Sequence, residues 1–118
     1  MATQIRPDAA TLDAARRYLA ILDKDYDIAA AYLFGSRARG THHEDSDADL
    51  AIILNGPKGT ANTISTMLKM VNPAYDVFLE TWIDISPMPI WLEDWEQPER
   101  HSNPGLIENI KDEGIAVL

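Results

Sequence analysis

The sequence has no cysteine and no long apolar run. The absence of cysteine excludes a disulfide scaffold, thiolate metal sites and thiol nucleophiles. No apolar segment approaches the roughly 20 residues that a membrane-spanning helix needs. The first residues, from Met1 to Pro7, lack the hydrophobic region of a signal peptide. We therefore expect a chain that works in the cytoplasm and makes no contact with a membrane.

Basic residues are also scarce. Ten lysines and arginines stand against 19 aspartates and glutamates, which gives a formal net charge of −9. A field of this sign repels the phosphates of nucleic acid, so it argues against direct binding of DNA or transfer RNA. It suits a cationic partner, or an anionic ligand that is held through a metal ion.

The apolar content is that of a folded protein. The chain has 118 residues, of which 46% are hydrophobic, and this is typical of a globular domain. The length predicts a single domain over residues 1–118.

Hydrophobic patterning predicts helices that alternate with strands. In order, we expect a helix after Pro7-Asp8, a strand at 28–34, a short helix at 36–39, a strand at 48–54, a long helix, a short strand at 83–87 and a helix between Asn103 and Gly114. Residues 115–118 form a last small strand or simply pack down. This order predicts a mixed α/β domain with few strands and with helices on at least one face of the sheet.

The long helix is predicted from apolar residues that recur at steps of three and four. They are Ile64, Leu68, Val71, Tyr75, Phe78 and Trp82. The periodicity continues past Pro73, which indicates a kink or a tight break in the helix. Pro87 and Pro89 confine the segment that follows to a sheet edge or an extended loop.

Two polar motifs adjoin the first two strands. Gly35-Ser36 comes directly after a buried strand and begins a short helix. Glycine allows a close backbone approach to a ligand, and a serine at a helix start offers a hydroxyl beside exposed backbone N–H groups, as in many phosphate sites.

The second motif is Asp47-Ala48-Asp49, at the entry to the next strand. Side chains alternate along a strand, so the two carboxylates point the same way. They repel one another unless a cation lies between them, and Mg²⁺ held by carboxylates and substrate phosphates is the usual arrangement.

Either motif alone has an ordinary explanation. A Gly-Ser pair is commonly a turn, and an Asp-x-Asp is commonly a solvated strand end. Together, with ten residues between Ser36 and Asp47, they resemble the signature of the DNA polymerase beta nucleotidyltransferase superfamily. The stretch from Leu33 to Gly40, followed by Ser46 to Leu50, is similar to the minimal nucleotidyltransferases, many of which are antitoxins of helical HEPN ribonuclease toxins.

The resemblance implies a fold and an active site. The fold would be α+β, a small mixed sheet with helices packed mainly on one face. Gly35 and Ser36 would hold the phosphates of a nucleoside triphosphate, and Asp47 and Asp49 would bind one or two Mg²⁺ ions. The family's third carboxylate lies on a neighbouring strand between apolar residues, and Asp84, in Ile83-Asp84-Ile85, fits this pattern.

Other polar and aromatic residues are assigned less directly. Asp76 competes for the role of third carboxylate, but the predicted helix places it at the surface. Arg37 is predicted to face the triphosphate or a partner, whereas Arg39 is expected to form a salt bridge that braces the loop. The three tryptophans, Trp82, Trp91 and Trp95, are expected in the core or against a partner, and nothing in the sequence selects one of them to stack on a nucleobase.

The length bears on which nucleotidyltransferase this is. Larger relatives carry a second helical domain for the acceptor, so here we expect the acceptor on another chain. The leading hypothesis is an antitoxin that transfers AMP from ATP to a hydroxyl, that of a tyrosine, on a HEPN toxin. One alternative is a binding antitoxin or scaffold with a weak nucleotide site, which acts by occlusion. Another is a small-molecule nucleotidyltransferase of the aminoglycoside type, which would need a homodimer to build the acceptor cleft.

Overall fold

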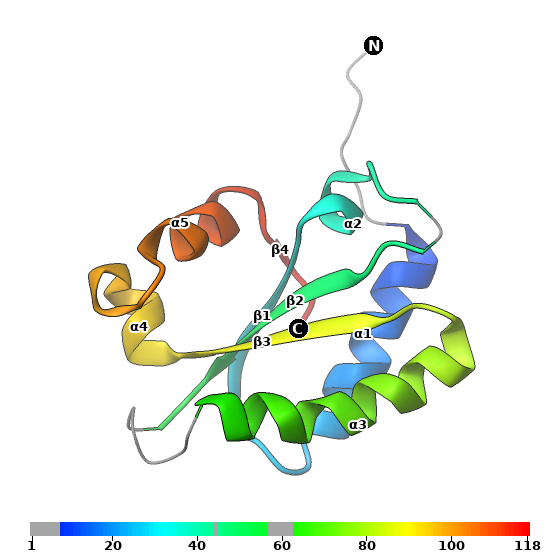
Figure 1. Cartoon of the computed structure of the whole chain (residues 1–118), viewed down its shortest axis with the longest axis horizontal. Coiled ribbons are helices and arrows are strands. Elements are labelled where there is room, and N and C mark those ends of the chain that lie inside the picture. Colours follow the sequence, from blue (N-terminus) through cyan, green and yellow to red (C-terminus); the bar gives the residue numbers. More distant parts are fainter. Residues whose placement is uncertain (1–7, 44, 57–62) are drawn as a thin grey trace.

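The computed structural model of the chain contains one four-stranded sheet and several helices, and it describes residues 8–43, 45–56 and 63–118 (Figure 1). The elements are α1 (Ala9–Leu22), β1 (Ile28–Phe34), α2 (Ser36–Arg39), β2 (Ala48–Leu54), α3 (Thr63–Thr81), β3 (Ile85–Trp91), α4 (Leu92–Glu96), the 3₁₀ turn η1 (Pro98–Arg100), α5 (Pro104–Glu113) and β4 (Ile115–Ala116). Within these described residues no helix is both long and apolar enough to cross a membrane.

The sheet is mixed, with the strand order β3-β2-β1-β4. Strands β1 and β2 are antiparallel, as are β1 and β4, whereas β2 and β3 are parallel. A parallel pair needs a crossover connection, and α3 provides it. The predicted α+β class is therefore confirmed.

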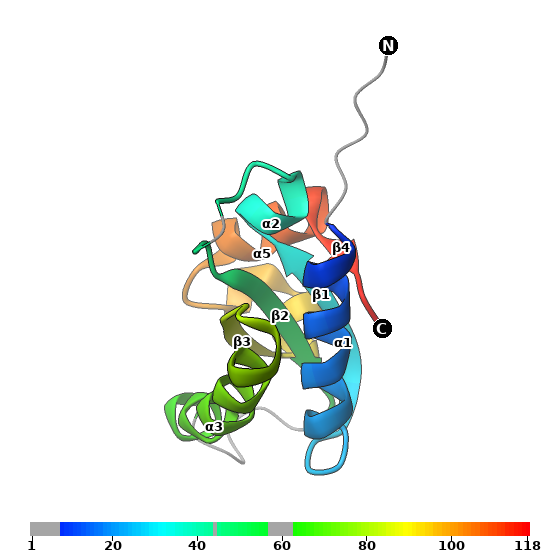
Figure 2. The ribbon, with the colours of Figure 1, turned by 90° about the vertical axis from the view of Figure 1, so that its right-hand side faces the viewer.

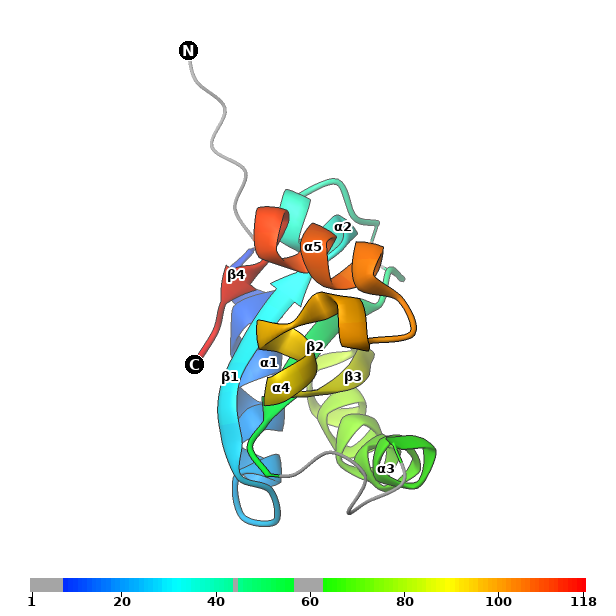
Figure 3. The same ribbon diagram turned by 90° about the vertical axis from the view of Figure 1, so that its left-hand side faces the viewer.

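Helices lie on both faces of the sheet. The two long helices, α1 and α3, lie side by side on one face (Figure 2), and the shorter α4 and α5 lie on the other (Figure 3). Even-numbered residues of β2, such as Leu50 and Ile52, pack under α1 and α3, while Ala51 and Ile53 pack towards α5. The alternation explains why β2 is apolar throughout, because both of its faces are covered.

Local interactions set the start of α1 and its contact with α3. The carboxylate of Asp8 caps α1 by accepting a hydrogen bond from the backbone N–H of Thr11 at 2.7 Å. Further along α1, the buried hydroxyl of Tyr18 donates to the carbonyl oxygen of Met70 at 3.0 Å. This bond ties the two helices on that face together.

Helix α3 has the predicted period, but it packs through a different face. It is continuous from Thr63 to Thr81 with Pro73 inside it, and Met70, Ala74 and Val77 are the residues buried against the sheet. Most of the predicted apolar stripe is instead exposed, including Leu68 and Trp82 at 66% and 74%. The helix has two apolar faces, and periodicity identifies the richer one without showing which of them meets the sheet.

Strand β3 forms one edge of the sheet, as the prolines indicate. It begins at Ile85, two residues later than predicted, and runs through Pro87 and Pro89 to Trp91. Proline is tolerated on an edge because its nitrogen, which has no hydrogen to donate, can face away from the neighbouring strand. Pro87 and Pro89 can therefore pair with β2 in register without a lost hydrogen bond.

The orientation of α3 can be tested by truncating one residue on each face. We expect Met70→Ala to lower the free energy of unfolding by about 2–4 kcal/mol, because it leaves a cavity in the core. Leu68→Ala should change it by about 0.5 kcal/mol or less, since this side chain is exposed. Urea unfolding of the two variants measures both values, and a larger loss for Leu68→Ala would reverse the assignment of the faces.

Candidate active site

The Gly35-Ser36 turn lies against the second strand. Gly35 has a φ of +76°, in the left-handed region that favours glycine. A Cβ atom at this position would collide with the carboxylate oxygen Oδ2 of Asp49. Glycine therefore fits this position best, because any other residue would combine a strained φ with a shift of the Asp49 side chain, and α2 begins directly after it at Ser36.

Asp47 and Asp49 share one face of β2. Asp47 immediately precedes the strand and Asp49 is its second residue. By strand alternation both lie in the row that continues to Ala51 and Ile53, on the same side of the sheet as α5. Asp49 is half-buried, and it is paired with Phe34 on β1.

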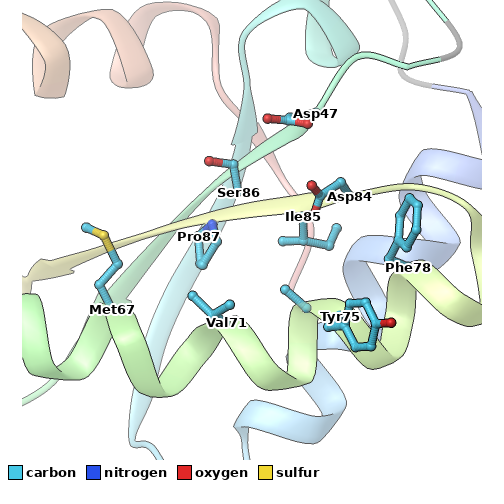
Figure 4. Close-up of a pocket in the computed structure, with 10 residues that line it drawn as sticks. Asp47, Met67, Val71, Tyr75, Phe78, Asp84, Ile85, Ser86 and Pro87 are labelled. Carbon is cyan, nitrogen blue, oxygen red and sulfur yellow. The ribbon is translucent and has the colours of Figure 1, made fainter.

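The parallel pairing of β2 and β3 brings Asp84 alongside Asp47. The backbone N–H of Ala48 donates to the carbonyl oxygen of Asp84 at 2.8 Å, and Ala48 is in register with Ile85. Asp84 thus lies just before β3 and not within the predicted strand, and its side chain comes to the same part of the sheet as that of Asp47 (Figure 4).

Ser86 is a neighbour of the acids that was not predicted as a site residue. It is in register with Asp49, and its side chain lies between the ends of β2 and β3 together with Asp47 and Asp84 (Figure 4). The alternation of Ile83-Asp84-Ile85-Ser86 could have predicted this position, since it puts Ser86 on the same side of the strand as Asp84.

The electrostatics of the acids show that they interact. Partial burial raises the pKa of Asp49, and the negative charge of Asp47 raises it further, while Arg39 acts in the opposite direction. Partial burial also raises the pKa of Asp84, again with a contribution from Asp47. The charge of Asp47 therefore disfavours the ionised forms of Asp49 and of Asp84, and a bound cation would relieve this repulsion.

These carboxylates form the donor set that Mg²⁺ prefers, although they do not already enclose an ion. Within residues 8–43, 45–56 and 63–118, no three or more His, Asp or Glu side chains are grouped so that they could hold a metal ion. Mg²⁺ is commonly bound by one or two carboxylates together with water and substrate phosphates. Asp47 and Asp49, with Asp84 beside them, fit that requirement, and their role as metal ligands stays a prediction.

The two arginines of α2 both brace the site. Arg37 is 3% exposed, and its guanidinium donates from Nε to the carbonyl oxygen of Ser46 at 2.7 Å and from Nη1 to the hydroxyl of Thr11 at 2.8 Å. These bonds hold the loop before Asp47 against α1, and a contact of Arg37 with nucleotide stays a prediction. Arg39 forms the predicted salt bridge, with Glu113 of α5 at 3.0 Å.

A groove leads from α3 over the edge strand to the acids. It encloses about 560 Å³, and Val71 and Tyr75 on one wall face Asp84 and Ser86 on the other (Figure 4). A second hollow of about 400 Å³ adjoins it and contains Trp82. Both are lined by Asp47, Phe78 and Asp84.

The three tryptophans and Asp76 lie in different surroundings. Trp82 is the tryptophan beside the acids. Trp95 stacks on Tyr32 with ring centroids 5.0 Å apart, and Trp91 packs against the core. Asp76 is exposed on α3, as the sequence predicted.

Comparison with known proteins agrees with this geometry. The sequence profile of the polymerase beta nucleotidyltransferase family matches residues 18–90, which include both motifs and Asp84. The match spans more than half of the chain, and the chain therefore belongs to this family. No curated protein is significantly similar to it.

Two solved structures share the fold. One is a protein from Sulfolobus solfataricus that is described as a candidate nucleotidyltransferase, with 16% identity, a TM-score of 0.52, and coverage of 90% of this chain and 78% of that one. The other belongs to a toxin–antitoxin structure with AMP-PNP, with 20% identity, a TM-score of 0.60, and coverage of 91% and 72%. At these identities the likeness shows the fold alone.

The contact between Gly35 and Asp49 predicts the effect of one methyl group. Gly35→Ala should lower the free energy of unfolding by about 1–3 kcal/mol, because it combines a positive φ with a collision. It should also shift the NMR signal of the Asp49 carboxyl carbon. Gly105→Ala is the matched control, because its new Cβ would meet only the Asn103 side-chain oxygen, at 3.8 Å. Equal stability of the two variants would contradict the tight contact.

The acids also predict a pH dependence in the absence of metal. Asp47→Asn should lower the pKa values of Asp49 and Asp84 towards the usual range, because it removes a negative charge that raises both. Carbon-detected NMR titration measures these values, with the exposed Asp112→Asn as the control.

The sign for stability follows from linkage. Because the two pKa values are raised in the folded protein, ionisation of these groups costs stability as the pH rises from the ordinary aspartate value of about 4 through the raised values. Asp47→Asn should reduce this cost, so the difference in unfolding free energy between pH 4 and pH 7 should be smaller than for Asp112→Asn. An unchanged pair of pKa values in Asp47→Asn would show that the carboxylates do not interact.

Proposed function

We propose that this chain is a Mg²⁺-dependent nucleotidyltransferase that moves AMP from ATP to a hydroxyl group of a partner protein. The observation that carries the proposal is the meeting of Asp47, Asp49 and Asp84 beside the Gly35-Ser36 turn. Family membership supports nucleotidyl transfer. The AMP-PNP in the similar toxin–antitoxin structure supports an adenine nucleotide as the donor.

Different residues are suited to binding the phosphates and to holding the metal ion. Ser36 and the first-turn N–H groups of α2 are suited to the outer phosphates, because they offer fixed donors without a negative charge. Asp47 and Asp49, with Asp84, would hold Mg²⁺. When bound, Mg²⁺ neutralises the charge that develops on the phosphates during transfer.

The transfer itself exchanges one phosphorus–oxygen bond for another. The acceptor hydroxyl oxygen bonds to the α-phosphorus, the bond from that phosphorus to the β-phosphate breaks, and pyrophosphate leaves. The hydroxyl proton needs an acceptor, and Asp84 is suited to the task because its carboxylate lines the groove beside Asp47. Positioning of the acceptor by the protein contributes the rest.

We further propose that the acceptor is a helical toxin of the HEPN type, modified on tyrosine, and that this chain is its antitoxin. Support comes from the sequence resemblance to minimal nucleotidyltransferases and from the fold shared with a toxin–antitoxin structure. The net charge of −9 favours a basic partner.

A second candidate function is neutralisation by binding alone. It is favoured by the exposed apolar face of α3, which is suited to holding a partner, and by carboxylates that do not enclose a metal site in the described residues. In this case the nucleotide site would be weak, and the toxin would be inactivated by occlusion.

Co-expression with the partner distinguishes the two functions. With the wild-type chain we expect the intact mass of the toxin to rise by one or more AMP units. Asp47→Asn combined with Asp49→Asn should abolish the increment, because it removes the metal ligands while the fold is kept. Asp25→Asn combined with Asp112→Asn removes the same charge from exposed positions and should leave the increment intact.

Two results of the co-expression experiment would contradict the proposed transfer. Full modification by the Asp47, Asp49 variant would overturn the metal assignment. A bound, neutralised and unmodified toxin in the wild-type sample would favour occlusion over transfer.

A further inference from the structure

The exposed face of α3 has the pattern of a helix that packs against another helix. Leu68, Tyr75 and Trp82 are seven residues apart, and Val71 and Phe78 form a second series with the same interval. Such a seam of two apolar positions in each heptad is typical of helix–helix contacts. We call these five residues, four of them on α3 and Trp82 directly after its end, the α3 seam. Leu68, Val71, Tyr75 and Trp82 are exposed, and Phe78 is partly buried.

The α3 seam is continuous with the candidate active site. Val71, Tyr75 and Phe78 line the groove that contains Asp47 and Asp84, and Phe78 and Trp82 line the adjoining hollow with the same two acids. Figure 4 shows the side chains of α3 on one side of β3 and the carboxylates on the other. A structure that lies along the seam therefore has its side chains next to the acids.

The edge strand beside the seam is unsuited to a partner strand. Because Asp84 directs its carbonyl oxygen towards β2, alternate backbone groups of β3 face β2, and those of Ile85, Pro87 and Pro89 face the outer edge. Proline has no N–H to donate. An added strand would find no donor at two successive outward positions, so the partner has to bind through side chains.

Charge distinguishes a foreign partner from a second copy of this chain. Asp76 is exposed on α3, and Asp45 joins Asp47 and Asp84 around Trp82. Two copies that met through this face would bring these acids together, with a net charge of −9 on each chain. A helix whose apolar seam is flanked by lysine or arginine would instead be attracted.

We propose that the α3 seam is the docking surface for an amphipathic helix with basic flanks, which belongs to the protein that receives AMP. The identity of that protein rests on the proposed function, whereas the location of the docking surface does not. The docked helix delivers its hydroxyl across the edge of β3 to Asp47 and Asp84.

Trp82 gives independent support. It has a φ of +62°, a conformation that is strained for a residue other than glycine. Its ring is 74% exposed and packs edge-on against Phe78, with centroids 5.6 Å apart. A glycine or asparagine would end the helix with less strain, so an exposed tryptophan here is better explained by binding than by folding.

The test uses the fluorescence of Trp82 and a synthetic helical peptide with leucine in its heptad seam and lysine at the flanks. Without ATP or metal, we expect the emission to move to shorter wavelength as the peptide covers the ring. Trp82→Phe should lose this signal, since Trp91 and Trp95 lie elsewhere. A peptide with glutamate at the flanks should bind at least about tenfold more weakly than the peptide with lysine.

A charge-matched pair of variants locates the surface. Leu68→Lys with Leu79→Lys changes two exposed residues of α3 that do not line the groove, and it should weaken peptide binding by about tenfold or more. Ala20→Lys with Leu118→Lys adds the same charge beside α1 and the chain end and should bind like the wild type.

Several results would overturn the proposal. These are an unchanged wild-type emission with the lysine-flanked peptide, equal binding by the α3 and control variants, and equal binding of the two peptides. A wild-type dimer in sedimentation that the α3 variant abolishes would assign the face to a second copy. Since the peptide assay contains no transfer step, a failure of AMP transfer in the co-expression experiment leaves its result intact.

The same variants extend the test to the transfer reaction. Where the wild type modifies its partner, Leu68→Lys with Leu79→Lys should raise the KM for the partner by about tenfold or more while the Kd for ATP stays unchanged. An unchanged KM would show that the acceptor reaches the acids by another route.

Discussion

The candidate site depends on one backbone hydrogen bond, from the N–H of Ala48 to the carbonyl oxygen of Asp84. It begins the parallel pairing of β2 with β3, and the register that follows brings Asp84 beside Asp47 and Ser86 beside Asp49. A shift of the register by one residue would turn Asp84 to the opposite face of the sheet. The crossover through α3 and the core that α3 shares with α1 hold this register in place.

The site combines close contact with electrostatic repulsion. The charge of Asp47 raises the pKa of both Asp49 and Asp84, while Arg37 and Arg39 hold the surrounding segments from outside the cluster. Folding thus places like charges together. The contacts of Arg37 with the loop at Ser46 and of Arg39 with Glu113 of α5 keep the neighbouring segments in place. This is the arrangement expected of a site whose charge is completed by a ligand and not by the chain itself.

Much of the fold and the motif residues could be predicted from the sequence, because they depend on local chemistry. The apolar runs identified β1 and β2, and the prolines identified β3 as an edge strand. The face of α3 that packs on the sheet could not be predicted, because Met70, Ala74 and Val77 carry less apolar surface than the stripe that stays exposed. Ser86 and the bond between Arg37 and Thr11 arise from register and tertiary packing, which no local pattern contains.

The place where Gly35 touches Asp49 has a consequence for how sequences of this kind diverge. The two halves of the site are joined by the antiparallel pairing of Phe34 with Asp49, and residues 40–43, 45 and 46 belong to no helix or strand. Loops at a surface tolerate insertion and deletion far better than paired strands do. The interval between the Gly-Ser turn and the Asp-x-Asp pair is therefore a property of the connecting loop, and chains with a different interval can hold the same site.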